Sequence, residues 1–190
     1  MGARREAAGV VRVYFQEITE GDRRKIEGKS NDAQTGGGAR DLRFPYEKFR
    51  SFFERMFPTT RSDKREGEQL TIHHGNVFWV DNAGLQQVSM IEFWPPTNAR
   101  PSEGRLGRVN QLGNLRALPP TSEGRLFVML TQLTGGEIRV RHVSEMALLD
   151  DSLTNEVVVE QVRKAFAAQR SNHSIRGFID WNEGEFYPYG

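Results

Sequence analysis

The sequence contains no cysteine and no long apolar run, and each absence excludes a class of protein. Without a cysteine among 190 residues, the chain has no disulfide framework and no thiolate to act as a nucleophile or zinc ligand. No apolar run approaches the roughly 18 residues of a membrane span, and no apolar signal core follows Met1–Arg5. We therefore expect a soluble, cytoplasmic protein that does not contact a membrane.

The net charge is close to zero, but the charges are unevenly distributed. The whole chain carries a formal net charge of +1. Residues 1–66 hold 15 Lys and Arg against 11 Asp and Glu, and residues 98–125 hold five against two. Residues 67–97 and 126–190 are acidic. If the fold brings the two basic segments together, they give a positive footprint of the kind that binds nucleic acid, although ordinary solvated charge gives the same pattern.

The length favours a single domain. A chain of 190 residues is long enough for its own core but short for a recognition domain plus a full catalytic domain. We expect one domain over residues 1–190. Its acidic and aromatic tail, from about residue 180, either packs on that domain or begins a linker.

Alternating apolar residues predict a strand-rich domain. Turn signals at 81–84 and 134–136 join neighbouring strands into hairpins, and connections this short require antiparallel pairing. We therefore expect a mainly β fold with flanking helices, of the α+β class, with its strands in a closed or half-closed barrel. The pattern predicts a turn at 20–25, a loop at 59–68, and strands at 9–17, 26–29, 70–72, 77–80, 85–93, 125–133 and 137–143.

Two helices are predicted. Pro45 suits the first position of a helix because its missing N–H is not needed there, and Pro58 ends the segment. A second helix is expected over 154–170, with Thr154 as its N-cap. The stripe along the first helix has the spacing of a core-facing surface rather than of a cofactor site, and consists of Phe49, Phe52, Phe53 and Met56.

A polar, glycine-rich stretch over residues 29–44 is the first candidate binding segment. Its three consecutive glycines let backbone N–H groups approach a ligand closely, and its side chains supply the donors that phosphate oxygens and base edges need. The same composition is typical of a solvated surface loop. The candidate contact residues are Lys29, Ser30, Asn31, Asp32, Gln34, Thr35, Gly36, Gly37, Gly38, Arg40 and Arg43.

A second polar stretch over residues 97–111 follows the strand-breaking Trp94-Pro95-Pro96. Arginine can bind guanine O6 and N7 together, Asn or Gln suits adenine, and Glu accepts from cytosine N4. A mixed segment that includes an acid is therefore better suited to discriminating bases than a purely basic one. The candidate contact residues here are Asn98, Arg100, Glu103, Arg105 and Arg108.

Residues 28–58 carry a polar Ser-Asn-Asp run, then Thr-Gly-Gly-Gly, an apolar-Pro entry into a helix, and a Met-Phe-Pro end. In that order they resemble the amino-terminal DNA-recognition (effector) domain of EcoRII-type restriction endonucleases. Residues 103–108, Glu-Gly-Arg-Leu-Gly-Arg, fit the Glu-x-Arg-apolar-x-Arg form of that family's second DNA-facing arm. Gly104 departs from the family pattern, because a basic residue is expected there. The resemblance covers roughly residues 10–145.

The resemblance implies an open pseudobarrel of about seven, mostly antiparallel strands, a fold shared with a family of plant transcription-factor DNA-binding domains. It implies sequence-specific binding of double-stranded DNA in the major groove, by two arms at 29–44 and 97–111. We expect phosphates to be held by Lys29, the Gly36–Gly38 backbone and flanking basic residues such as Lys25 and Arg61. The chain is then a recognition domain whose partner is a nuclease domain or subunit, or a stand-alone defence protein.

Two other classes of function stay open. A metal-dependent nuclease would use the acid-x-Lys triplet at Glu27 and Lys29, with Glu17 or Glu20 as an upstream acid. A protein-interaction domain would bind without a steep dependence on salt. Adjacent histidines at 73–74 would point to opposite faces of a strand and not to one metal ion, and the triple glycine lacks the ending of a P-loop. We assign no catalytic residue, no metal and no cofactor.

Overall fold

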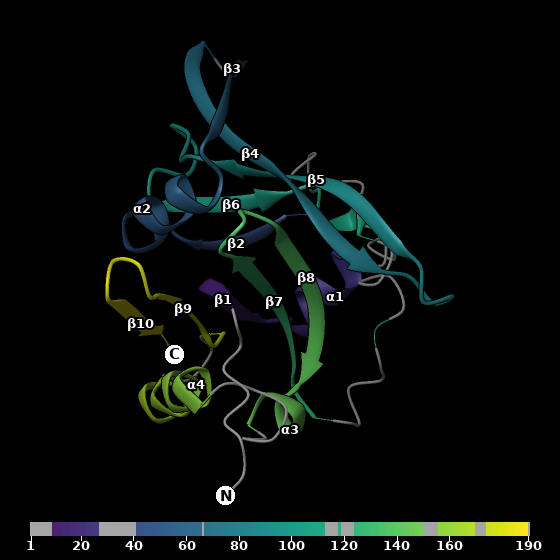
Figure 1. Ribbon diagram of the computed structural model, residues 1–190. Coiled ribbons are helices and arrows are strands. Elements are labelled where there is room, and N and C mark those ends of the chain that lie inside the picture. The colour runs from purple at the N-terminus through teal and green to yellow at the C-terminus, as the bar shows by residue number, and fades with distance from the viewer. Residues whose placement is uncertain are drawn as a thin grey trace, which may run out of the picture. The chain divides into compact units, whose positions relative to one another are not determined.

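The computed structural model describes residues 9–26, 41–65, 67–112, 118, 124–149, 156–169 and 174–189. Its elements are labelled in Figure 1. The chain divides into two compact units, which we call the central unit, Ile18–Pro119, and the terminal unit, Met1–Glu17 with Pro120–Gly190. The expectation of a single domain over residues 1–190 stays a prediction.

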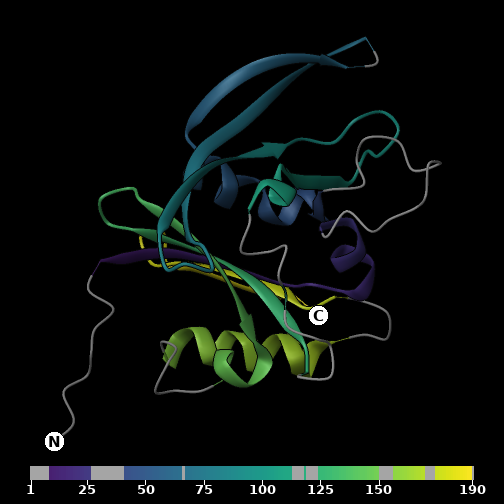
Figure 2. The same cartoon turned by 90° about the vertical axis from the view of Figure 1, so that its right-hand side faces the viewer.

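The terminal unit is an antiparallel set of five strands with two helices. In spatial order the strands are β10, β9, β1, β7 and β8. Figure 2 shows the longer helix lying along one face of these strands. The elements are β1 (Val10–Glu17), β7 (Leu126–Leu133), β8 (Ile138–Ser144), α3 (Glu145–Leu148), α4 (Glu156–Ala168), β9 (Arg176–Asp180) and β10 (Glu185–Tyr189).

The core of the terminal unit lies between this helix and the strands. Phe15 of β1 and Phe127 of β7 are fully buried, and they belong to one apolar cluster with Val158 and Val162 of α4. The helix confirms the one predicted from the apolar spacing, while its expected N-cap, Thr154, lies outside the described residues.

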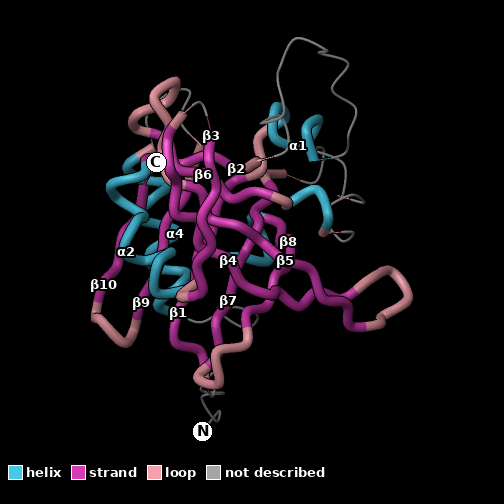
Figure 3. Tube along the Cα trace, turned by 90° about the horizontal axis from the view of Figure 1, so that it is seen from above, coloured by secondary structure: helices cyan, strands magenta, loops and turns pink. Residues whose placement is uncertain are grey.

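The central unit holds five strands in the order β3, β4, β5, β6 and β2, each paired antiparallel with its neighbour. Figure 3 shows the β4–β5 hairpin with its connecting loop. The elements are α1 (Glu20–Ile26), β2 (Leu42–Pro45), α2 (Tyr46–Met56), β3 (Thr59–Arg65), β4 (Glu68–Val80), β5 (Gln86–Trp94), β6 (Glu103–Gly107) and a short 3₁₀ helix, η1 (Val109–Gln111).

An aromatic core attaches α2 to one face of the central strands. Phe44 of β2 lies 4.9 Å from Phe53 of α2, and Phe53 lies 5.2 Å from Phe93 of β5, measured between ring centroids. The predicted helix is confirmed: Pro45 occupies its N-cap, and the predicted stripe of Phe49, Phe52, Phe53 and Met56 is the buried face. These rings fix the orientation of β5 and β6, on which the candidate site is built.

The strand count and the sheet class differ from the prediction. The described residues form ten strands rather than seven, and the sheet as a whole is mixed rather than mostly antiparallel, although the pairings given above within each unit are antiparallel. The predicted strands at 70–72 and 77–80 are one strand, β4, and five segments without a predicted strand form β2, β3, β6, β9 and β10. Residues 59–65, expected as a loop, are β3, and part of the acidic tail is β10. The coarser prediction, a mainly β fold with helices, is confirmed.

The predicted turn at 20–25 and the strand beginning at Ile26 are wrong, because Glu20–Ile26 is the helix α1. Thr19 Oγ1 accepts a hydrogen bond from the Asp22 backbone N–H at 3.2 Å, and Asp22 Oδ2 accepts one from the Thr19 backbone N–H at 3.2 Å. This reciprocal pair is a capping box. No helix in the described part of the chain is long and apolar enough to cross a membrane.

Candidate functional site

Strand alternation places charged residues on the side of the central sheet away from α2. Phe93 packs into the aromatic core, so its neighbours Glu92 and Trp94 point to the other side. On β6, Gly104 lies against Phe44 in the core. Glu103 and Arg105, one residue to either side of Gly104, therefore face the same way as Trp94.

Three arginines surround the indole of Trp94. The guanidinium carbons of Arg65, Arg105 and Arg61 lie 4.1, 4.7 and 5.4 Å from the ring centroid. The tryptophan is only 4% exposed, so the arginines cover it and no space is left for a stacked base. Each cation–π contact contributes about 0.5–2 kcal/mol, depending on desolvation. We call this side of the unit the arginine face, and it comprises Arg43, Arg61, Arg65, Arg100, Arg105 and Arg108.

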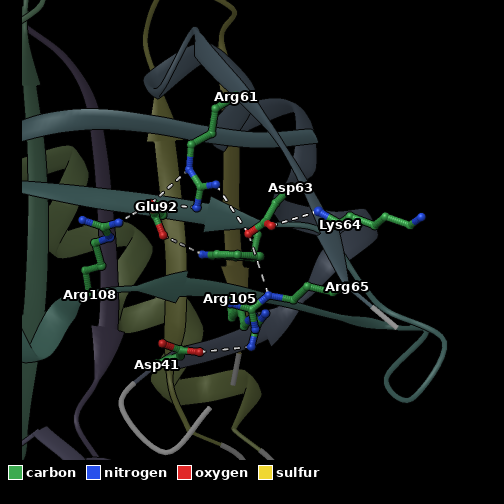
Figure 4. Close-up of polar contacts among 9 residues, drawn as sticks. Asp41, Arg61, Asp63, Lys64, Arg65, Glu92, Arg105 and Arg108 are labelled. Carbon is green, nitrogen blue, oxygen red and sulfur yellow. Dashed lines mark hydrogen bonds and ion pairs between the residues drawn. The ribbon is translucent and has the colours of Figure 1, made fainter. Parts of the chain in front are cut away.

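Glu92 is the buried carboxylate behind this face. Its side chain is 3% exposed, and its Oε1 atom lies 3.0 Å from a guanidinium nitrogen of Arg61 and 3.0 Å from one of Arg108. Its Oε2 atom accepts a hydrogen bond from the Trp94 indole N–H at 3.1 Å. Figure 4 shows Glu92 between the two arginines. Glu92 thus links β3, β5 and the end of β6 through one acid group.

A second carboxylate, Asp41, holds Arg105. Asp41 Oδ2 lies 3.3 Å from a guanidinium nitrogen of Arg105, and the two side chains are 11% and 18% exposed. Burial raises the pKa of Asp41 to about 6, although the positive charges of Arg105 and Arg65 oppose the rise. The same burial lowers the pKa of Arg105. The acid therefore titrates within a range accessible to binding experiments.

Glu103 bridges the half-buried Arg43 and the exposed Arg100 at the edge of the face. Its Oε2 atom accepts hydrogen bonds from Arg43 and Arg100, each at 3.0 Å. Both bonds use Oε2, and Glu103 lines a hollow of about 30 Å³ together with both arginines. A volume of this size accommodates about one water molecule. Glu103 can thus accept a further hydrogen bond while its arginines stay in place.

The structure explains why Gly104 stands where the family pattern has a basic residue. A Cβ on Gly104 would lie 2.7 Å from Phe44 Cε2 and 3.1 Å from Tyr46 Cδ2. The position faces the aromatic core and has no room for a side chain. A basic residue at position 104 would point into the aromatic core, so the glycine there does not reduce the number of cations on the arginine face.

The second predicted arm contains a paired strand. Residues 103–107 form β6, hydrogen-bonded to β2 on one side and to β5 on the other. Their polar pattern led us to expect an irregular segment, but Leu106 is buried and anchors the strand. Arg43 of the first predicted arm lies directly opposite Arg105 of the second in this register. The fold thus brings together one member of each predicted arm.

The remaining predicted residues are placed as follows. Asn98 and Arg100 lie in the exposed connection before β6, where the Asn98 backbone N–H donates to Glu68 Oε2 at 3.2 Å. Arg108 follows β6 directly. The candidates Lys29, Ser30, Asn31, Asp32, Gln34, Thr35, Gly36, Gly37, Gly38 and Arg40, and Glu27 of the nuclease alternative, lie outside the described residues.

Sequence reasoning missed four residues of the site: Asp41, Arg65, Glu92 and Trp94. Two of them had a usable signal, because the alternation through Glu92, Phe93 and Trp94 predicts that an acid and an indole share one face of a strand. Asp41 and Arg65 had no such signal, since their partners lie far away in sequence.

The arginine face carries more positive than negative charge. Its six arginines are matched by Asp41, Asp63, Glu92 and Glu103, of which Glu92 and Glu103 each pair with two arginines. The neighbouring Lys64 adds a further cation on β3. A surplus of positive charge on one surface attracts polyanions.

The described residues contain no group of three or more His, Asp and Glu side chains that could hold a metal ion. His73 Nδ1 lies 2.9 Å from the carbonyl oxygen of Phe57, which orients its ring against the backbone. A hollow of about 380 Å³ beside it is lined partly by Tyr46, Arg50 and Glu54 of α2.

No protein-family model matches this sequence, and no curated protein matches it either.

Proposed function

We propose that this chain binds double-stranded DNA sequence-specifically, with the arginine face turned toward the major groove. The observation that carries the proposal is the cluster of six arginines on one face of the central unit, in excess of its carboxylates. Guanidinium groups are the most common protein contacts to guanine edges, and they also bind phosphates.

The arrangement favours base reading over simple charge attraction. Arg105 is held by both Asp41 and the Trp94 ring, so less conformational entropy is lost when it forms two parallel hydrogen bonds. Glu103 has an oxygen available to accept from cytosine N4. A surface that only attracted phosphates would not need a carboxylate at its exposed edge.

In this proposal the two predicted segments contact different parts of the duplex. Arg105, Arg108 and Glu103 read base edges, and residues 29–44 approach the same duplex to hold phosphates and further bases. The resemblance to EcoRII-type recognition domains supports two DNA-contacting segments, since it implies two arms that meet the major groove. It also implies that such a domain supplies specificity while a separate domain cuts. The partners are then double-stranded DNA and a nuclease domain or subunit, or DNA alone in a stand-alone defence protein.

The test is a selection from a randomised duplex library, half of it cytosine-methylated, at two salt concentrations and without metal. We expect a short enriched motif, and binding that weakens linearly with the logarithm of salt concentration. The double variant R105A/R108A is run in parallel and is expected to lose the motif. The variant K48Q, which removes an exposed cation from α2, serves as the control.

Recovery of no motif above background overturns the proposal. Cleavage of the library after Mg²⁺ or Mn²⁺ is added, and its loss in E27A, would instead favour the metal-dependent nuclease. Binding to a protein partner without steep salt dependence would favour an interaction domain.

A further inference from the structure

Strand β3 contributes Arg61 and Arg65 to the arginine face and adds Lys64, in a segment that neither predicted arm includes. Thr59–Arg65 pairs with Glu68–His74 of β4 and, among the described strands, with no other. It is therefore an edge strand, with one row of backbone groups not engaged in the sheet. The cations on it are Arg61, Lys64 and Arg65.

Alternation gives these cations two orientations. Arg61 and Arg65 turn toward Trp94, over whose ring both guanidinium groups lie. Lys64 extends away from Arg61, Asp63 and Glu92, as Figure 4 shows. Its ammonium group forms no ion pair with the described residues, and its side chain is exposed. The strand thus combines two oriented guanidinium groups with one ammonium group that is free to contact a ligand.

The β3 carboxylate does not neutralise this set. Asp63 lies 3.4 Å from Arg61 and 3.9 Å from Arg65, measured between oxygen and nitrogen. It therefore orients both arginines, and Arg61 is also paired with Glu92, so the excess positive charge of the strand lies on Lys64 and Arg65. The shared contact with Trp94 brings Arg65 next to Arg105 of β6, so the β3 cations flank the residues proposed to read bases.

We propose that β3 is a third DNA-contacting element, which binds phosphate groups of the duplex through Lys64 and Arg65. This inference rests on the proposed function of the arginine face. Residues on β6 reach base edges in the groove, and β3, whose Arg65 shares the Trp94 ring with Arg105, meets the sugar-phosphate backbone at the groove's margin. Phosphate contacts of this kind fix position and orientation but carry no sequence information.

The experiment measures duplex affinity against salt concentration for the full chain and for three variants. We expect the slope of log K against log salt to become shallower by about 0.9 for each phosphate that the protein no longer neutralises, in both K64Q and R65Q. Affinity for the selected motif and for a random duplex should fall by the same factor. The control K48Q removes an exposed lysine from α2 and should leave the slope unchanged.

Tryptophan fluorescence of each variant checks that the site is intact, and K64Q is decisive because Lys64 does not cover Trp94. Unchanged slopes in K64Q and R65Q, with the wild type still binding its motif, overturn this inference alone. A change of sequence preference in either variant also overturns it, since that would make β3 a base reader. Failure of the wild type to bind any duplex overturns the proposed function and this inference with it.

Discussion

The Trp94 indole N–H donates a hydrogen bond to Glu92, two residues earlier on the same strand, across 3.1 Å. The indole ring is in turn covered by arginines from β3 and β6, and the carboxylate pairs with Arg61 and Arg108 from the same two regions. One acid and one aromatic ring therefore fix the positions of four guanidinium groups.

Replacement of the buried acid, E92Q, is expected to lower the free energy of unfolding by about 2 kcal/mol, because two arginines lose their shared charge while the amide keeps the volume. Urea unfolding followed by tryptophan fluorescence measures the change. The control is E54Q on α2, whose ion pair with Arg50 is largely exposed and contributes less than about 0.5 kcal/mol. Equal losses in the two variants would show that Glu92 has no special role.

The elevated pKa of Asp41 predicts that stability falls as pH rises. Because the folded-state pKa is about 6 against an ordinary value of 3.8, the folded protein binds the proton more tightly than the unfolded chain. The contribution of Asp41 to stability is therefore greatest below pH 4 and is lost as the pH rises through 6, by at most about 3 kcal/mol. The comparison of D41N with the wild type from pH 4 to pH 8 measures it, and identical pH profiles would contradict it.

The same titration predicts pH-dependent DNA binding. Protonation of Asp41 removes a negative charge next to Arg105, so duplex affinity should rise as the pH falls through 6. Binding measured from pH 5 to pH 8 at constant ionic strength tests this. In D41N the rise should be absent, which assigns it to Asp41. A rise of the same size in D41N would assign the effect to another group.

Arginine at position 105 is predicted to set base preference through its forked geometry. R105K keeps the positive charge but loses the two parallel donors, so discrimination at one base pair should fall by about 1–3 kcal/mol. Affinity for random duplex should change little. K29A, in the segment outside the described residues, should instead weaken binding to all sequences alike. Equal losses on selected and random duplexes for both variants would contradict this division of roles.

Substitution G104A is expected to destabilise the central unit by about 1–3 kcal/mol, because the new methyl group would lie 2.7 Å from Phe44 in a closely packed core. Thermal unfolding of the variant tests this. The matched control is G135A in the β7–β8 turn, where an added Cβ meets no atom within 4 Å. A stable G104A protein would show that the aromatic core yields readily at this position.

The sequence predicted elements whose signal is local. The stripe of Phe49, Phe52, Phe53 and Met56 and the adjacent Pro45 indicated α2, because burial of one helix face imposes that spacing. Strand β3 escaped prediction because it is an edge strand: none of its residues is buried, so it has no apolar alternation to show. Helix α1 was not predicted because its segment has no apolar periodicity. Its sequence signal is the Thr19–Asp22 capping box, which involves only two residues.

The candidate site was predicted only in part, because only some of its residues have a local signal in the sequence. Arg105 and Arg108 stood out because they follow each other in a polar segment. Their partners did not, since Asp41 contacts Arg105 across 64 positions of sequence and Arg61 contacts Glu92 across 31. Contacts at such separations are set by strand register, which local spacing does not encode.

Arg108 has a backbone φ of 66°, the only positive value found at a non-glycine residue in the described part of the chain. Glycine adopts this conformation without a Cβ clash, whereas another residue is destabilised by roughly 1 kcal/mol there. The variant R108G would relax the backbone and at the same time lose the guanidinium group that pairs with Glu92. The backbone and the side chain thus make opposite demands at this one position, and the chain keeps the guanidinium group that pairs with Glu92 in place of the more relaxed backbone.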